Sequence, residues 1–400
     1  MTADTGKNIK NIFSLSIPII VENLLQTLLG VTDTYFAGKI ADIAIAGIGV
    51  TNLVMNILIA FFTALTVGTV AITARNYGRK DYKRVNSSIM HSIVLGIALG
   101  VVSGAVCVLF RTPILHITGA DSSIIPYAMP YYIIVAGPCV FLCLQLILSS
   151  CLRAVEDTKT PMYVTVATNI IKILLTMLFV KMGMGIFGLG LATTLSRVIG
   201  TVVLLVCLQR HDKNISLSFC KLTGKEFSPI LRIGIPAGME KLIMKMGQLI
   251  YIGMVIRLGT SAYVAHNIAS NIDNLAWSCA MGFGLAACTM VGISLGQDNI
   301  EQAKKLTTTA NFISVITLSV IGVFIFIFAR QLAAIFTKTE ELQDIIVPIL
   351  RIVAIIQPFS ALLQNMTSVL QGAGDTKFPM YSTFVGIWGI RDCIGFLFAV

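Results

Sequence analysis

Ionisable side chains lie within long apolar runs of this 400-residue sequence. A charge in such a run is costly unless it has a partner or faces a water-filled cavity. Glu22 and Asp33 are eleven residues apart, which is three helical turns, and so lie close to one face of a helix. The later runs contain Lys172, Arg197, Glu240, Lys241, Lys245, His266, Asp273, Arg351, Arg391 and Asp392. This set predicts that the helices line a polar chamber.

The composition places these helices in a membrane. Hydrophobic residues make up 56% of the chain and charged residues 12%, with a mean hydropathy of +0.86; a soluble domain would have about a quarter charged. Crossing the hydrocarbon core of a bilayer takes about 20 helical residues. Eleven apolar runs reach this length: 11–36, 46–72, 88–110, 128–151, 161–181, 186–208, 229–256, 262–290, 307–329, 346–370 and 379–400.

The sequence repeats itself at an offset of 218 residues. Pro18 matches Pro236, Glu22 matches Glu240, and the Asp-Thr-Lys of 157–159 recurs at 375–377. A constant offset indicates two homologous lobes. We expect an all-α protein on a twelve-helix plan: an N-terminal lobe of six helices over 1–210, a cytoplasmic linker over 211–228, and a C-terminal lobe over 229–400 with five. The chain would end within the eleventh span, with the sixth helix of the second lobe missing.

Charge in the connections gives the orientation. Seventeen Lys and Arg residues of the connections lie on one side and six on the other, which puts the N-terminus in the cytoplasm. The net charge of +10 is therefore a topology signal, and no nucleic-acid partner is expected. The nine cysteines and four histidines show no metal-ligand spacing, and no phosphate-binding loop is present. Neither a metal nor a catalytic site is expected.

Several motifs resemble those of multidrug and toxic compound extrusion (MATE) transporters. Residues 11–49, with Asp33-Thr34, are similar to that family's first span and following loop. Residues 264–268 (Val-Ala-His-Asn-Ile) look like its Ala-Ala-His-Gln-Ile signature, and residues 370–377 (Leu-Gln-Gly-Ala-Gly-Asp-Thr-Lys) look like its Leu-Arg-Gly-x-Gly-Asp-Thr-Lys. Residues 152–159 are the counterpart in the first lobe, so the resemblance covers essentially the whole chain.

The resemblance implies two six-helix lobes related by a pseudo-twofold axis, with a central cavity that opens alternately to either side. It implies a monomeric antiporter of the cell inner membrane that exports amphipathic, often cationic, drugs and other xenobiotics in exchange for protons or sodium. Duplicated lobes with a site between them are a common basis of alternating access. Membrane lipid is the other expected partner, and no cofactor beyond the coupling ion is expected.

The resemblance to the DinF-like branch assigns a coupling site to the first lobe. There the first-span acid, matched by Asp33, works with a fifth-span Asn and an Asp four residues later. This sequence has Lys172 and Thr176 at those places and keeps Asn169 one turn earlier. The candidate coupling residues are thus Asp33, Lys172, Asn169 and Thr176. The candidates for the substrate cavity are Glu22, Gln26, Arg197, Glu240, Met244, His266 and Asp273.

The second lobe differs from the family pattern. Other members use a seventh-span Glu with a tenth-span Asp, and the matching positions here are Met244 and Ser360. The repeat places Tyr251 opposite Asp33. A coupling site in the second lobe is therefore doubtful.

An ammonium beside Asp33 favours the ionised carboxylate and could occupy the place of a bound sodium ion. Protons are thus favoured over sodium as the coupling ion. A static Asp33–Lys172 pair remains an alternative. Glu22 and Glu240, each four residues after a proline, could instead lie in a first helical turn and meet the helix dipole. Asp157 and Asp375 are expected to cap the helices that contain Pro161 and Pro379.

Two other functions stay open at this point. A flippase for a lipid-linked saccharide would want a more strongly cationic chamber for pyrophosphate, which Lys172, Arg197, Lys241 and Lys245 could provide. An intramembrane enzyme is disfavoured, because no paired Asp motif, Ser-His pair or His-Glu zinc pattern lies within the spans.

Overall fold

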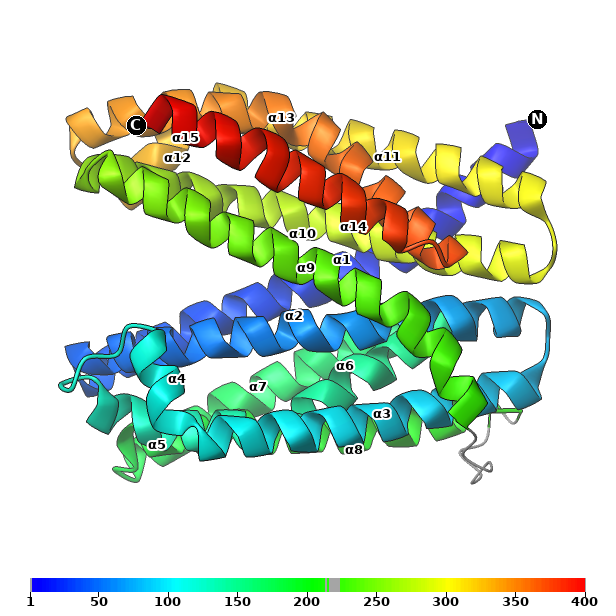
Figure 1. Cartoon of the computed structure of the whole chain (residues 1–400), viewed down its shortest axis with the longest axis horizontal. Coiled ribbons are helices and arrows are strands. Elements are labelled where there is room, and N and C mark those ends of the chain that lie inside the picture. Colours follow the sequence, from blue (N-terminus) through cyan, green and yellow to red (C-terminus); the bar gives the residue numbers. More distant parts are fainter. Residues whose placement is uncertain (1, 213, 216–223, 400) are drawn as a thin grey trace. The chain divides into compact units, whose positions relative to one another are not determined.

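The computed structural model describes residues 2–212, 214–215 and 224–399 (Figure 1). The described residues form helices and no strand. The helices are α1 (Thr2–Ile40), α2 (Asp42–Gly78), α3 (Tyr82–Leu109), α4 (Arg111–Ile117), α5 (Ile125–Ala136), α6 (Cys139–Ala154), α7 (Lys159–Lys181), α8 (Gly185–His211), α9 (Gly224–Arg257), α10 (Thr260–Gly296), α11 (Ile300–Ile327), α12 (Ala329–Phe336), α13 (Glu340–Ala373), α14 (Lys377–Phe384), the π-helix η1 (Val385–Asp392) and α15 (Cys393–Ala399).

Packing divides the chain into two compact units. The first unit spans Val21–Gly238, and the second comprises Met1–Ile20 and Met239–Val400. The lobe boundaries expected from the sequence stay a prediction, and half of the expected linker, at 213 and 216–223, lies outside the described residues.

The first unit is a bundle built on α2, α3, α5, α6, α7 and α8. Helix α6 packs against α2, α3 and α8, and α7 packs against α8 (Figure 1). The core is filled by large buried side chains such as Phe62, Tyr131 and Tyr132. Close helix contact depends on glycine: a Cβ at Gly104 on α3 would lie 2.2 Å from the carbonyl oxygen of Gly137. Any larger residue there would force α3 away from its neighbour.

The second unit is centred on α10, α11 and α13, which pack against one another. Its core includes Phe283 and Met290 of α10 and Leu306 of α11. Ile12 and Ile19, from the first half of α1, belong to the same core. The start of α9, in contrast, belongs to the core of the first unit. Its residues Ile233 and Ala237 pack with Val67 and Ala71 of α2.

Helices α1 and α9 therefore each contribute to both units. The two changes of unit, after Ile20 and after Gly238, are 218 residues apart, which is the offset of the sequence repeat. Each helix contains a proline two residues before this point, Pro18 in α1 and Pro236 in α9. The duplicated halves thus exchange the first parts of their first helices.

Most expected membrane spans are present. The described part of the chain has eight helices long and apolar enough to cross a membrane, or nine if α5 and α6, bent by 46° at Gly137-Pro138, form one broken span. Two of the eleven expected runs do not meet this criterion. Helix α9 carries Glu240, Lys241 and Lys245 within its length, and the run at 379–400 is divided into α14, η1 and α15.

The turn before α7 depends on Asp157. Its Oδ1 accepts a hydrogen bond from the backbone N of Thr160 at 3.0 Å, and its Oδ2 lies 3.2 Å from Nδ1 of His211. Asp375 accepts in the same way from the backbone N of Phe378 at 3.2 Å. Both acids thus cap the helix that follows them, as the sequence predicts. Burial acts to raise the pKa of Asp157, but the hydrogen bonds from His211 and Thr160 outweigh it and lower the pKa to about 2.

The lowered pKa predicts an acid-dependent contribution to stability. The ionised Asp157 stabilises the fold above its unfolded pKa of about 3.8, and this contribution is lost as the pH falls toward about 2. We expect Asp157→Asn to destabilise the detergent-solubilised protein by about 2 kcal/mol at pH 6. The difference in melting temperature from wild type should shrink below about pH 4. A difference that does not change with pH would contradict this account.

Candidate functional site

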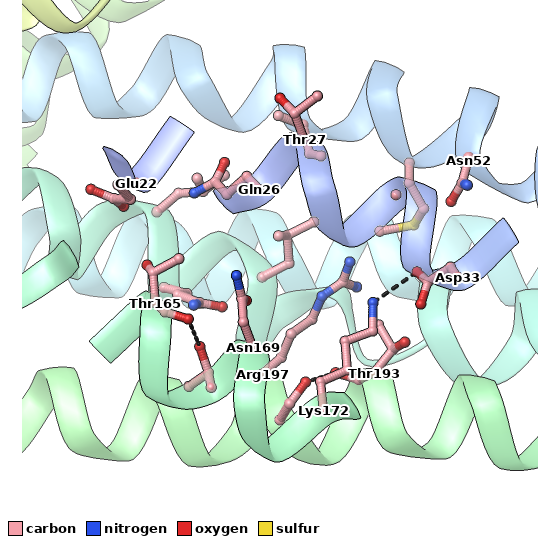
Figure 2. A pocket seen from close by; sticks show the side chains of 18 of the residues that line it. Glu22, Gln26, Thr27, Asp33, Asn52, Thr165, Asn169, Lys172, Thr193 and Arg197 are labelled. Atoms are coloured by element: carbon pink, nitrogen blue, oxygen red, sulfur yellow. Dashed lines mark hydrogen bonds and ion pairs between the residues drawn. The ribbon is translucent and has the colours of Figure 1, made fainter. Parts of the chain in front are cut away.

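A polar pocket lies inside the first unit (Figure 2). Its volume is about 380 Å³, and residues of α1, α2, α6, α7 and α8 line it. Six of the predicted site residues are brought together there: Glu22, Gln26, Asp33, Asn169, Lys172 and Arg197. The chamber that the sequence predicts therefore includes a site within the first half of the chain.

Asp33 and Lys172 form a direct ion pair across this pocket. Nζ of Lys172 on α7 donates to Oδ2 of Asp33 on α1 at 2.7 Å, as the dashed line in Figure 2 shows. The side chain of Lys172 is 8% exposed and that of Asp33 is 10% exposed. The stability of a buried charge pair depends on both partners, because removing one of them leaves the other charge buried and uncompensated.

The other predicted members of the coupling site lie on the same helix, α7. Asn169 lines the pocket, and its Nδ2 donates to the backbone oxygen of Leu25 on α1 at 3.3 Å. Thr176 is buried one turn beyond Lys172 and is not among the residues that line the pocket. The roles of these residues in coupling stay predictions.

Arg197 of α8 reaches into the pocket between the side chains of Asn169 and Lys172 (Figure 2). Its Nη1 atom is buried and has no hydrogen-bond partner among the described residues. Its side chain therefore adds a cation to the pocket without a matching carboxylate.

Glu22 lies at another part of the pocket and is paired with Arg153. Nη2 of Arg153 donates to both carboxylate oxygens of Glu22 at 2.7 Å. The interpretation of Glu22 as a residue of a first helical turn is wrong, because α1 begins at Thr2 and runs through Pro18. The same holds for Glu240, since α9 begins at Gly224.

The second unit contains a related contact at the equivalent place. Glu240 is the repeat partner of Glu22, and Gln371 is the repeat partner of Arg153. Nε2 of Gln371 donates to Oε2 of Glu240 at 3.1 Å. The duplicated halves thus keep the contact between these helices, but only the first half makes it an ion pair.

The equivalent of the Asp33–Lys172 pair is also changed in the second unit. Tyr251 replaces Asp33, and the guanidinium of Arg391 lies over its ring at 5.3 Å from the centroid. Lys172 matches Ile390, the residue before this arginine. A carboxylate is therefore missing where the first unit has Asp33.

The remaining cavity candidates lie in the second unit and do not line the pocket. His266 is half-buried, with its Nε2 3.3 Å from Oγ of Ser270. Oδ1 of Asp273 accepts from Nε2 of Gln357 at 2.7 Å. Met244 is half-buried on α9. None of these three residues lines the pocket of the first unit.

Sequence reasoning missed much of the pocket wall. Its uncharged polar residues include Asn52, Asn56, Gln145, Ser149, Thr193 and Ser196. An amide within an apolar run is the one signal that could have found Asn52, Asn56 and Gln145. Arg153 was missed as a site residue because it lies in the last turn of α6, where a basic residue is typical of a cytoplasmic connection.

The Glu22–Arg153 pair leads to a stability prediction. Arg153→Leu leaves the Glu22 carboxylate, 2% exposed, without a counter-charge, and should destabilise the protein by about 3–5 kcal/mol. Arg153→Gln copies the pair of the second unit and should cost less, because the amide still donates a hydrogen bond. Thermal unfolding in detergent measures both, with Arg330→Gln as the exposed control. Losses for both variants no larger than that of Arg330→Gln would show that the pair is unimportant.

Comparison with known proteins agrees with this architecture. The family model described as MatE matches residues 18–178 and again 236–397. The chain belongs to the MatE family. The two matched segments begin at the repeat-equivalent prolines Pro18 and Pro236. The resemblance to MATE transporters, and the prediction of a transporter and not an enzyme, are confirmed.

Two relatives and one solved structure illustrate the similarity. The chain is 30% identical over 394 residues to the "Probable multidrug resistance protein NorM" of Thermotoga maritima, covering 97% of this chain and 85% of the relative. It is 25% identical to the "Uncharacterized transporter YisQ" of Bacillus subtilis, covering 98% and 87%. A structure described as the outward-facing conformation of a multidrug resistance MATE family transporter matches with a TM-score of 0.91 at 21% identity, covering 98% and 88%.

These findings confirm the fold class. The MatE protein is an all-α, multi-pass membrane protein with two homologous lobes, as the sequence predicts. Assignment to the DinF-like branch within the family stays a prediction.

Proposed function

We propose that this protein is a proton-coupled antiporter that exports amphipathic drugs or other toxic organic compounds by alternating access. The observation that carries the proposal is the buried Asp33–Lys172 ion pair in the wall of a polar pocket. The relative from Thermotoga maritima is named a probable multidrug resistance protein, which supports drugs as the cargo. The protein acts as a monomer in the cell inner membrane, with a cytoplasmic N-terminus.

The pair can exchange a proton for a cationic substrate. The two groups are 2.7 Å apart, so a proton gained or lost by one changes the interaction with the other. A substrate cation that approaches the Asp33 carboxylate competes with the proton and with the Lys172 ammonium. Binding of substrate on one side of the membrane therefore releases a proton there, and reprotonation on the other side releases the substrate.

Protons suit this site better than sodium. A bound alkali cation needs several oxygen ligands, and the Lys172 ammonium occupies the position beside Oδ2 of Asp33. A sodium ion at that place would be repelled, and it lacks the apolar contacts with Met55 and Leu142 that can offset this repulsion for an organic cation. Sodium coupling is therefore the weaker alternative.

Transport by proteoliposomes tests the proposal. Purified protein is reconstituted in liposomes loaded with the cationic dye rhodamine 123, and either a pH gradient or a sodium gradient is imposed. We expect the pH gradient to accelerate release of the dye and the sodium gradient alone to have little effect. Movement driven only by sodium would disprove proton coupling, and no movement under either gradient would disprove the antiporter.

A further inference from the structure

The charges around the pocket do not balance. The carboxylate of Glu22 is neutralised by Arg153, and that of Asp33 by Lys172. The guanidinium of Arg197 remains, and no carboxylate of the described residues lies within 4.0 Å of it. Taken with its partners, the pocket thus carries one positive charge more than negative charges.

The position of this charge is suited to a ligand. Nη1 of Arg197 is buried, and none of the residues that the structure describes accepts a hydrogen bond from it. Figure 2 shows the side chain extending into the pocket beside Asn169 and Lys172. The side chain of Arg197 as a whole is half-buried and lines the pocket, so it can meet a ligand group that supplies both an acceptor and a negative charge.

The rest of the wall limits what this ligand can be. A volume of about 380 Å³ is within the range for small-molecule sites. The neutral lining offers amides and hydroxyls, among them Asn52, Gln145 and Ser196. A single unmatched positive charge suits a monoanion, whereas the pyrophosphate of a lipid-linked saccharide would leave negative charge uncompensated. The planar fork of a guanidinium matches a carboxylate in particular.

We propose that the pocket binds the carboxylate of an amphipathic substrate, with Arg197 as the residue that selects it. This inference rests on the proposed export function and names a class of cargo for it. Asp33 and Lys172 exchange the proton, and Arg197 contacts the acidic group of the cargo. Compounds that carry a carboxylate should therefore bind better than their esters.

Binding of a matched pair of dyes tests the inference. Rhodamine 110 carries a free carboxylate, and rhodamine 123 is its methyl ester. Fluorescence anisotropy with the purified protein at pH 7 gives the dissociation constant of each. Arg197→Gln should weaken binding of rhodamine 110 about tenfold and change that of rhodamine 123 less than about twofold. The control Arg197→Lys keeps the charge and should retain part of the preference.

The outcomes that oppose the inference are distinct. Equal effects of Arg197→Gln on both dyes, or no effect on either, would overturn it. A second measurement uses the wild-type protein alone, so that it does not depend on the folding of a variant: 1-naphthylacetate should displace rhodamine 110 at concentrations about tenfold lower than its methyl ester does. Equal displacement would also overturn the inference.

Transport separates this inference from the proposed function. Movement of rhodamine 123 driven by a pH gradient, without any carboxylate preference in binding, would overturn the role of Arg197 and leave the antiporter standing. A carboxylate preference without movement of either dye under a pH gradient would overturn the antiporter and support the anion site.

Discussion

Asp33→Asn should reduce proton-driven export to background. The amide fills the same space as the carboxylate, but it cannot gain or lose a proton in the physiological range. The variant should also lose stability, because the Lys172 ammonium, 8% exposed, loses its counter-charge. Efflux of rhodamine 123 from proteoliposomes under an imposed pH gradient, together with thermal unfolding, measures both effects.

Two further variants separate loss of coupling from loss of stability. The double variant Asp33→Asn/Lys172→Met removes both buried charges, so it should regain much of the stability while export stays at background. Asp344→Asn removes a carboxylate that is 70% exposed in the second unit and should leave export unchanged. Asp33→Asn with most of the wild-type export would show that Asp33 does not couple transport.

Replacing Lys172 should move the pH dependence of export. A carboxylate without a neighbouring ammonium takes up a proton more readily. The pH optimum of Lys172→Met is therefore expected about one unit or more above that of the wild type. The measurement is the efflux rate against pH at a fixed gradient.

Lys172→Asn, compared with Lys172→Met, tests whether the site can respond to sodium. It restores the residue of the family pattern, and its amide oxygen is a ligand that an alkali cation accepts, so this variant should respond to sodium where Lys172→Met does not. Superimposable pH profiles for the wild type and both variants would mean that the pair is static and only holds α1 to α7.

The sequence predicted those parts of the site and fold in which a physical constraint acts on single residues. A carboxylate and an ammonium within apolar runs need partners, and the family pattern brought Asp33 and Lys172 together; the structure places them 2.7 Å apart. The Asp157 and Asp375 caps followed from their distance to a proline. The repeat predicted equivalent helices in the two halves, and even the changes of unit in α1 and α9 keep its offset.

Other features depend on packing that the sequence pattern does not contain. Arg153 lies at a helix end, where a basic side chain is ordinary, and only the tertiary structure directs it to Glu22. The exchange of the first parts of α1 and α9 between units leaves no mark in hydropathy, because hydropathy does not show which unit a helix packs against. The uncharged polar residues of the pocket wall also could not be predicted from the sequence, since single Asn, Ser and Thr residues are common in helices that pack together.

The central claim is that substrate and proton compete at the Asp33–Lys172 pair. The most direct test is proton release from the purified protein in weakly buffered detergent solution, followed with a pH-sensitive dye while rhodamine 123 is added. The wild type should release about one proton for each dye molecule bound, because one substrate cation replaces one proton at the pair, and Asp33→Asn should release none while it remains folded. The same release from both proteins would contradict the claim.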